Sequence, residues 1–373
     1  MNRRLSCFVV ASFLVVPLGA AMQADAASPR TSSSGGPAVA RGTGGAVASV
    51  DRIASRAGIA VLRRGGNAID AAVAMAATLG VTEPYVAGLG GGGFMVVYLA
   101  DEDRVITIDG RENCPQACRQ DMFLDPRTGA PRNFQAMVHS GLSVGVPGNL
   151  ATWDLALRRY GTLPLSDALR PAERVAGRGF AVDGSFRQQT LIAIRRLRAF
   201  TPSRRLFLDS GKAPKVGTQL RNPDLARAYR VIGRRGIDAF YHGRIGRALV
   251  HTVRRPPIDP GTNLKVRPGF MTRSDLAGYR PFLRPPTKVS YRGRQVFGMG
   301  PPSSGGSTVG EALNILSGYD LASESKARAL HHDAHERCFI ASSVSFPVDA
   351  APEFLVAEPG AHEPGGATPA AVT

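Results

Sequence analysis

Residues 64–112 decide the fold of this 373-residue chain, and they read RGGNAIDAAVAMAATLGVTEPYVAGLGGGGFMVVYLADEDRVITIDGRE. Gly65 and Gly66 suit the left-handed backbone that ends a helix, because they carry no Cβ. Asn67 then offers a side-chain oxygen to cap the next helix, and Asp70 favours the positive end of that helix. Residues 68–79 are almost wholly apolar and rich in alanine. They predict a helix that is buried on most sides.

A glycine-rich turn and a β-hairpin follow this helix. Four consecutive glycines precede the β-branched and aromatic run at 94–98, and an acidic turn leads to a second run at 105–108. Gly88, Gly90 and Gly93 also match the GxGxxG pattern of dinucleotide-binding loops. That chemistry needs a strand before the glycines and a helix after them, and the order here is reversed. We therefore interpret the glycines as room for close backbone packing.

Arg111 is the candidate binding residue of this stretch. It directly follows the second apolar run, within the sequence DGRE at 109–112. A guanidinium in this position can hold a carboxylate through two parallel hydrogen bonds. From spacing alone, the simpler interpretation is an ion pair with Asp109, Glu112 or another acidic residue.

Six segments in one fixed order resemble the γ-glutamyltransferases, also called glutathione hydrolases. They are GGNAIDAA at 65–72, GLGGGGF at 88–94, DGRE at 109–112, SVGVPG at 143–148, DAFYHG at 238–243 and PPSSGG at 301–306. The resemblance extends over about residues 46–332 and concerns the large-subunit portion of the family.

The resemblance implies the α/β class, with helices and strands mixed as in α+β proteins, and the four-layer αββα sandwich of N-terminal-nucleophile hydrolases. Members of the family are precursors that cleave themselves, and the new N-terminal threonine of the small subunit attacks a γ-glutamyl carbonyl. The α-amino group of that threonine acts as the base, since its pKa lies near neutrality. The resemblance assigns Arg111 to the α-carboxylate of a γ-glutamyl substrate such as glutathione. It implies no cofactor.

The chain departs from the family after its middle. No Thr-Thr-His segment, the family's nucleophile signature, occurs in the sequence. We expect the nucleophile-bearing small-subunit half to be missing, the fold to be incomplete, and this chain to be inactive unless a complementing chain is present. The alternatives are a non-catalytic truncated or frameshifted remnant, an acylase of the cephalosporin or glutaryl type, and a secreted basic anion-binding protein.

The two ends of the chain differ from its body. Residues 1–26 have the positive start, apolar stretch and small-residue end of a signal peptide, and residues 27–45 form a Ser-, Gly- and Pro-rich linker. We expect export to a periplasm or the outside, and no membrane span, because the apolar run is too short. Residues 46–332 form the family-like domain, and residues 333–373 a divergent tail that we expect to be disordered.

The charge, the cysteines and the histidines of the chain bear on three questions: nucleic-acid binding, disulfide formation and metal binding. The formal net charge is +17, but the basic residues are spread over every segment without a recognisable nucleic-acid motif, so no specific nucleic-acid partner is expected. Cys114 and Cys118 are close enough in sequence to form a disulfide in an exported protein. His331 and His335 lie one helical turn apart but lack the acidic residue of a zincin motif, so no metal site is expected.

The rest of the chain reads as helices with a few short strands. We predict helices at 150–160, 164–178, 223–235, 244–254 and 308–316, and strands at 45–50, 141–147, 287–291 and 295–298. Residues 184–218 are very basic and show no clear pattern, so we predict irregular structure there.

Overall fold

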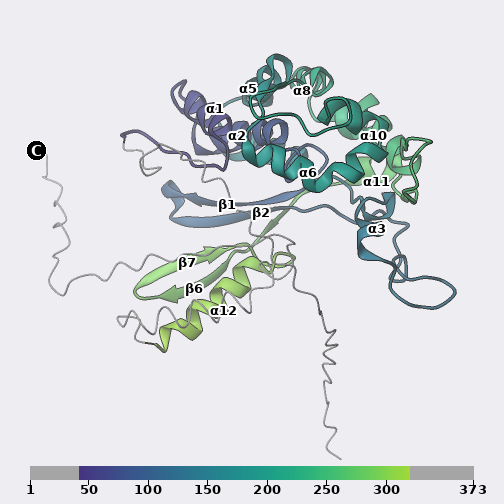
Figure 1. Ribbon diagram of the computed structural model, residues 1–373. Coiled ribbons are helices and arrows are strands. Elements are labelled where there is room, and N and C mark those ends of the chain that lie inside the picture. The colour runs from purple at the N-terminus through teal and green to yellow at the C-terminus, as the bar shows by residue number, and fades with distance from the viewer. Residues whose placement is uncertain (1–41, 320–373) are drawn as a thin grey trace, which may run out of the picture. The chain divides into compact units, whose positions relative to one another are not determined.

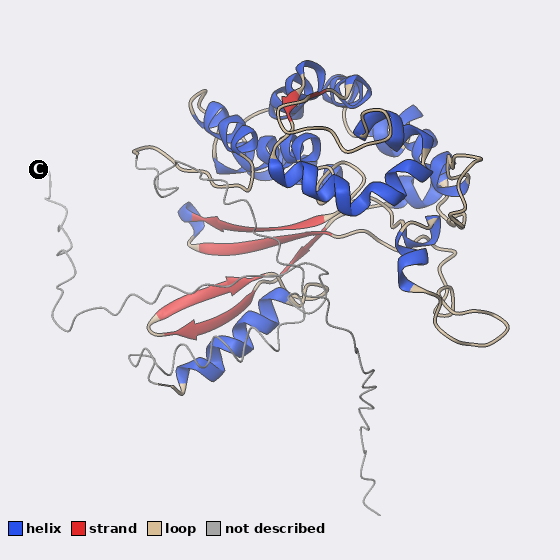
Figure 2. Ribbon diagram, in the orientation of Figure 1, coloured by secondary structure: helices blue, strands red, loops and turns tan. Residues whose placement is uncertain are grey.

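The computed structural model describes residues 42–319. All the elements below belong to one compact unit that begins at residue 45. Helices alternate with short antiparallel strands, which confirms the mixed α/β class (Figure 2). The helices are α1 (Arg52–Leu62), α2 (Ala68–Thr82), α3 (Phe134–Val138), α4 (Asn149–Tyr160), α5 (Leu165–Arg178), α6 (Gly184–Ala199), α7 (Thr201–Phe207), α8 (Pro223–Arg235), α9 (Asp238–Tyr241), α10 (Arg244–Arg254), α11 (Arg273–Gly278) and α12 (Gly305–Ser317). The strands are β1 (Gly93–Leu99), β2 (Arg104–Gly110), β3 (Phe180–Ala181), β4 (Gln219–Leu220), β5 (Phe282–Arg284), β6 (Thr287–Tyr291) and β7 (Arg294–Gly298), with 3-10 turns η1 (Ala100–Glu102) and η2 (Gly141–Ser143).

The start of α2 follows the sequence prediction closely. Gly65 has a left-handed backbone with φ of +85°, and the Asn67 side chain accepts from the amides of Ile69 and Asp70. The Asn67 amide in turn donates to Asp70 Oδ2 at 2.8 Å, which completes a capping box. The helix extends to Thr82, three residues beyond the predicted end at residue 79, and most of its residues are buried.

The predicted hairpin forms and gains a third strand. β1 pairs antiparallel with β2, with Gly93 opposite Gly110 and Leu99 opposite Arg104. β5 pairs with the other edge of β2, so β2 is the central strand of the sheet. The end of β2, where Arg111 follows, is therefore flanked by backbone from both neighbours.

Helices gather on one side of the β1–β2 pair (Figure 1). α4 contacts both strands, α2 packs on α1 and α5, and α5 packs on α8. The apolar faces of α2, α4, α5 and α8 form one core, to which Leu150, Leu169 and Ile232 contribute side chains that are at most 1% exposed. Tyr229 is buried in the same core, and its hydroxyl donates to the carbonyl oxygen of Ala77 in α2 at 2.8 Å.

The β6–β7 hairpin and α12 pack on each other and contribute no buried residue to the main core. α12 lies along the hairpin (Figure 1) and contacts both of its strands. Two glycines permit this approach: a Cβ on Gly310 would lie 2.8 Å from Val289 Cγ1, and one on Gly298 would lie 2.7 Å from the Cα of Gly306. β6 and β7 match the predicted strands to within one residue, and α12 begins three residues before the predicted helix.

Three sequence predictions are wrong. Residues 45–50 form no strand, because no partner strand runs beside them in the described part of the chain, although Val47 packs against α1 and α2. Residues 141–147 form the turn η2 and a single bridge between Val146 and Asn113 rather than a strand. The basic segment 184–218 contains α6 and α7. In α6, Phe186, Thr190, Ala193 and Leu197 are buried at helical spacing, a stripe that the many arginines obscure in the sequence.

Several predictions remain untested. The signal peptide, most of the linker and the tail at 333–373 lie outside the described residues, as do His331 and His335. The domain limits and the four-layer sandwich also stay predictions. Among the described residues, no helix combines the length and apolar character that crossing a membrane requires.

Candidate functional site

Arg111 is the first residue after β2, and its backbone is fixed from two sides. Its amide donates to Asp109 Oδ1 at 3.0 Å. Its carbonyl oxygen accepts a 2.9 Å hydrogen bond from the hydroxyl of Tyr279. The side chain of Arg111 is exposed. The backbone is thus held in place at a residue that is exposed to solvent.

The acidic neighbours of Arg111 have other partners. Asp109 is buried, and its Oδ2 lies 2.6 Å from Nε of Arg284 on the neighbouring strand β5. Glu112 turns toward the glycine-rich segment, where its Oε2 would lie 2.8 Å from a Cβ on Gly92. Among residues 42–319, Arg111 forms no ion pair. The ion pair that spacing alone suggested for Arg111 is made by Arg284 instead.

Glycines allow three backbone segments to meet beside Arg111. A Cβ on Gly92 would lie 2.5 Å from the carbonyl oxygen of Gly110, and one on Gly148 would overlap that oxygen and the Tyr279 hydroxyl. A Cβ on Gly110 would in turn overlap the hydroxyl of Thr152 in α4. Of the four consecutive glycines, Gly92 serves close backbone packing, as the sequence order indicated, whereas a Cβ on Gly90 would meet no atom within 4 Å. A helix precedes the four glycines and a strand follows them.

The turn before α4 is joined to the glycine-rich segment by hydrogen bonds. The amides of Gly148 and Asn149 both donate to the carbonyl oxygen of Gly91 at 3.0 Å. The Asn149 side chain donates from Nδ2 to the carbonyl oxygen of Gly88 at 2.8 Å. Two of the sequence motifs, at 88–94 and 143–148, thus form one connected structure at the end of β2.

Two stacked tyrosines donate hydrogen bonds to the backbone at Pro147 and Arg111. The rings of Tyr241 and Tyr279 are 6.0 Å apart and nearly parallel. The Tyr241 hydroxyl donates to the carbonyl oxygen of Pro147 at 2.9 Å and accepts from the amide of Ala151 at 3.2 Å. Burial raises the pKa of both phenols, and for Tyr279 the carboxylates of Asp109 and Glu112 add to the effect. Both hydroxyls therefore stay protonated and able to donate at neutral pH.

Sequence reasoning identified some of these residues and missed others. Tyr241 lies within the motif at 238–243, which the structure brings to the site without any role having been predicted for it. Arg284 and Tyr279 belong to no motif, and only the three-dimensional arrangement identifies them. The motif at 301–306 has its closest contacts elsewhere: Gly306 lies against Met299 and Thr287, beside the β6–β7 hairpin.

Cys114 and Cys118 form a disulfide just after the candidate site, as their spacing allowed. The turn between them is anchored to α11, because the Gln116 amide donates to Asp275 Oδ1 at 2.9 Å. Within residues 42–319, no group of three or more histidine, cysteine or acidic side chains is placed to hold a metal ion.

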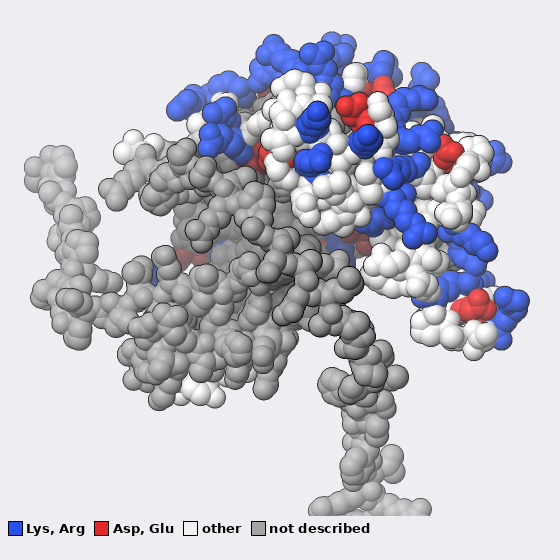
Figure 3. Space-filling view, viewed as in Figure 1, with Lys and Arg blue, Asp and Glu red and all other residues white. Residues whose placement is uncertain are grey.

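Basic side chains are distributed over the visible described face rather than gathered in one stripe (Figure 3). Many of them belong to the helices that cover the sheet, and acidic side chains are few among them (Figure 3). The exposed guanidinium of Arg111 therefore belongs to a protein with a general positive field.

Comparisons with known proteins lead to the family that the six motifs resemble. The family model for gamma-glutamyltranspeptidase matches residues 54–342. The glutathione hydrolase proenzyme of Escherichia coli is 36% identical over 278 residues, which are 74% of this chain and 46% of that protein. The acylase ACY 1 proenzyme of a Pseudomonas species is 37% identical over 288 residues, 76% of this chain and 50% of that protein.

The fold leads to the same family. The crystal structure of the Helicobacter pylori gamma-glutamyltranspeptidase superposes with a TM-score of 0.73 at 30% identity, covering 83% of this chain and 86% of that one. The chain spans about half the length of the curated relatives that it matches. From the family model, the relatives and the fold together, we conclude that this chain belongs to the γ-glutamyltranspeptidase family.

Proposed function

We propose that this chain is the carboxylate-binding, large-subunit-like part of a γ-glutamyltransferase that acts on glutathione and other γ-glutamyl compounds. The proposal is supported above all by the exposure of Arg111 and by its lack of an acidic partner among the described residues. Its side chain is exposed and without an ion pair among residues 42–319, while the nearest buried acid, Asp109, is neutralised by Arg284. A guanidinium in this state is available for a substrate carboxylate.

In this proposal Arg111 binds the α-carboxylate of the γ-glutamyl group through two parallel hydrogen bonds. Hydrogen bonds to a charged partner contribute about 1.5–3 kcal/mol each. The hydrogen bonds of the Arg111 amide and carbonyl to Asp109 and Tyr279 hold the base of the side chain in place. Less conformational entropy is then lost when the substrate binds.

In this proposal the nucleophile of the reaction lies outside these 373 residues. The 373 residues contain no Thr-Thr-His segment. We propose that an N-terminal threonine on a small-subunit polypeptide attacks the γ-carbonyl, with its own α-amino group as base and with amide donors for the oxyanion. That polypeptide would also complete the four-layer αββα sandwich. The chain alone is then inactive, and we expect it to act after export.

Hydrolysis of a chromogenic γ-glutamyl amide tests the proposal. We expect no turnover by the 373-residue chain alone and measurable turnover after co-expression with the small subunit of a relative. In the active complex, Arg111→Gln should raise KM for the γ-glutamyl amide at least about tenfold. Arg63→Gln removes another exposed arginine outside the site and should leave KM unchanged. Turnover by the chain alone, or equal KM values for the Arg111 variant and the unaltered complex, would reject the proposal.

An acylase is the second candidate, favoured by the 37% identity to acylase ACY 1. Glutaryl and γ-glutamyl groups both carry a terminal carboxylate, so Arg111 can serve either substrate. They differ in the α-amino group, which only the γ-glutamyl group has. The ratio of kcat/KM for the two acyl groups in the completed enzyme separates the candidates, and a preference for the glutaryl amide would favour the acylase.

A further inference from the structure

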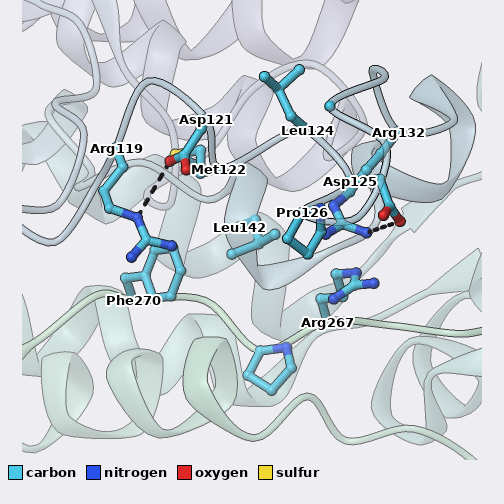
Figure 4. A pocket seen from close by; sticks show the side chains of 12 residues that line it. Arg119, Asp121, Met122, Leu124, Asp125, Pro126, Arg132, Leu142, Arg267 and Phe270 are labelled. Carbon is cyan, nitrogen blue, oxygen red and sulfur yellow. Dashed lines mark hydrogen bonds and ion pairs between the residues drawn. The ribbon is translucent and has the colours of Figure 1, made fainter.

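A cavity of about 560 Å³ lies between the loop at 119–132 and the segment at 267–270. The turn η2 contributes Leu142 to its wall (Figure 4). None of the residues that line it belongs to the surroundings of Arg111 described above. Its volume falls within the range of small-molecule sites.

Three arginines line the cavity, and two of them have acidic partners. Arg119 Nε lies 3.4 Å from Asp121 Oδ1, and Arg132 Nη1 lies 3.4 Å from Asp125 Oδ2. Arg267 forms no ion pair with any residue between 42 and 319. In the view of Figure 4, Arg132 and Arg267 lie together on one side of the cavity and Arg119 on the other. One positive charge of the lining is therefore uncompensated.

Arg132 also carries an unsatisfied donor. Its side chain is only 14% exposed, and its Nε is buried without a hydrogen-bond partner among the described residues. An atom this buried is closed to a ligand in the cavity. A bound anion would instead meet the free charge of Arg267, beside which Arg132 lies in Figure 4.

Apart from these arginines and the carboxylates of Asp121 and Asp125, which also line the cavity, the lining is mostly apolar. Met122, Leu124, Leu142 and Phe270 provide side-chain surface, and none of them offers a strong hydrogen-bonding group. An anion without an apolar part, such as phosphate, would leave this surface without a partner. A carboxylate attached to an aliphatic or aromatic body matches both parts of the lining.

Both walls of the cavity are held by backbone contacts. On one side, the Asp125 amide donates to the carbonyl oxygen of Ala130 at 2.8 Å and closes the loop. On the other, the Gly141 amide donates to the carbonyl oxygen of Arg267 at 2.7 Å, and a Cβ on Gly141 would lie 2.5 Å from the Val253 carbonyl oxygen. The cavity is therefore formed before any ligand arrives, which lowers the entropy lost on binding.

We propose that this cavity is a binding site for a small carboxylate with an apolar body, in which Arg267 and Arg132 bind the carboxylate and Leu142 and Phe270 contact the apolar part. The site is separate from Arg111 and does not depend on the activity proposed above. Its ligand would bind to the chain whether or not a nucleophile is present.

Calorimetric titration of the full chain with hippurate, a carboxylate with a phenyl group, tests the site. Arg267→Gln should weaken hippurate binding at least about tenfold, since it removes a charged hydrogen-bond donor. Arg235→Gln removes one exposed positive charge from the end of α8 and should leave the affinity unchanged. Hippuramide, which has the same body without the charge, should not bind.

Two further variants test whether hippurate binds in this cavity and not near Arg111. Leu142→Trp places a larger side chain in the cavity, so it should abolish binding while the melting temperature stays within a few degrees of the unaltered chain. Arg111→Gln should leave hippurate binding unchanged. The proposal fails if the unaltered chain does not bind hippurate, if Arg267→Gln and Arg235→Gln weaken it equally, or if binding is lost with Arg111 and kept without Arg267.

Discussion

At the scale of single residues, the position of Arg111 depends on a tyrosine far away in the sequence. Tyr279 donates its hydroxyl to the Arg111 carbonyl oxygen, and its ring stacks on Tyr241. Tyr279→Phe should lower the free energy of unfolding by about 0.5–1.5 kcal/mol, because one hydrogen bond is lost and the carbonyl oxygen is left without its partner. Urea unfolding followed by circular dichroism measures the change.

Tyr291→Phe is the matched control for this variant. The Tyr291 hydroxyl lies on the β6–β7 hairpin, and no hydrogen bond to it is formed within the described part of the chain. Its removal should change the free energy of unfolding by less than about 0.5 kcal/mol. Equal effects of the two substitutions would show that the Tyr279 hydroxyl does not support Arg111.

A single methyl group should be enough to disturb the site at Gly148. A Cβ there would overlap the Gly110 carbonyl oxygen and the Tyr279 hydroxyl, and backbone cannot move away as a flexible side chain can. Gly148→Ala should therefore destabilise the chain by about 1–3 kcal/mol or more. Gly278→Ala meets no atom within 4 Å and should be neutral or slightly stabilising. Thermal melting of the two variants compares them directly.

At the scale of elements, the start of α2 depends on the buried carboxylate of Asp70. Burial by itself raises the pKa of Asp70, but hydrogen bonds from the Thr162 hydroxyl and from the amides of Asn67, Leu163 and Thr162 outweigh it, so the pKa lies below its ordinary value. A carboxylate with a depressed pKa stabilises the fold above its unfolded pKa near 4. That stabilisation is lost as the pH falls through the folded pKa.

Asp70→Asn tests this pH dependence. The substitution removes the charge that four donors converge on, so we expect a loss of about 2–4 kcal/mol at pH 7. The variant should also lose less stability than the unaltered chain between pH 5 and pH 2, since Asp70 no longer takes up a proton on unfolding. Urea unfolding across this pH range gives both results. Parallel pH curves for the two proteins would contradict the assignment.

At the scale of the whole molecule, apolar side chains remain exposed on the sheet and on α12. Val96 and Tyr98 on β1 are 47% and 61% exposed, and Val309 and Ile315 on α12 are 51% and 56% exposed. β1 is also an edge strand, with unpaired backbone along one side within the described residues. Exposed apolar surface beside an open edge favours association. We therefore expect the chain alone to be poorly soluble and to self-associate.

Ile315→Lys should raise the monomer fraction of the isolated chain, because it removes exposed apolar surface from α12. Asn314→Lys adds the same charge at the preceding residue, where the side chain is already polar and exposed. Light scattering coupled to size-exclusion chromatography compares the two variants. If Asn314→Lys raises the monomer fraction equally, charge and not the apolar surface controls association. A soluble, monomeric unaltered chain with one cooperative melting transition would contradict the expectation outright.

The sequence predicted the local features of the site better than its contacts. The cap at Asn67 and the glycine-rich turn follow from backbone chemistry within a few residues, so their positions are correct. Two predicted strands fail because a strand needs a partner: residues 45–50 have none in the described chain, and Val146 meets only Asn113. α6 escaped detection because arginines surround the apolar stripe that begins at Phe186.

By itself, the sequence determined where the helix before the glycines begins and that a hairpin follows them, and its family resemblance identified Arg111 as the candidate carboxylate-binding residue. Only the tertiary structure decided that Arg111 has an exposed side chain without an ion pair among the described residues. The reason is that the competing cation, Arg284, arrives from a strand 175 residues along the chain and takes Asp109. Spacing in sequence cannot reveal which of two arginines neutralises a buried acid, because sheet pairing makes that choice.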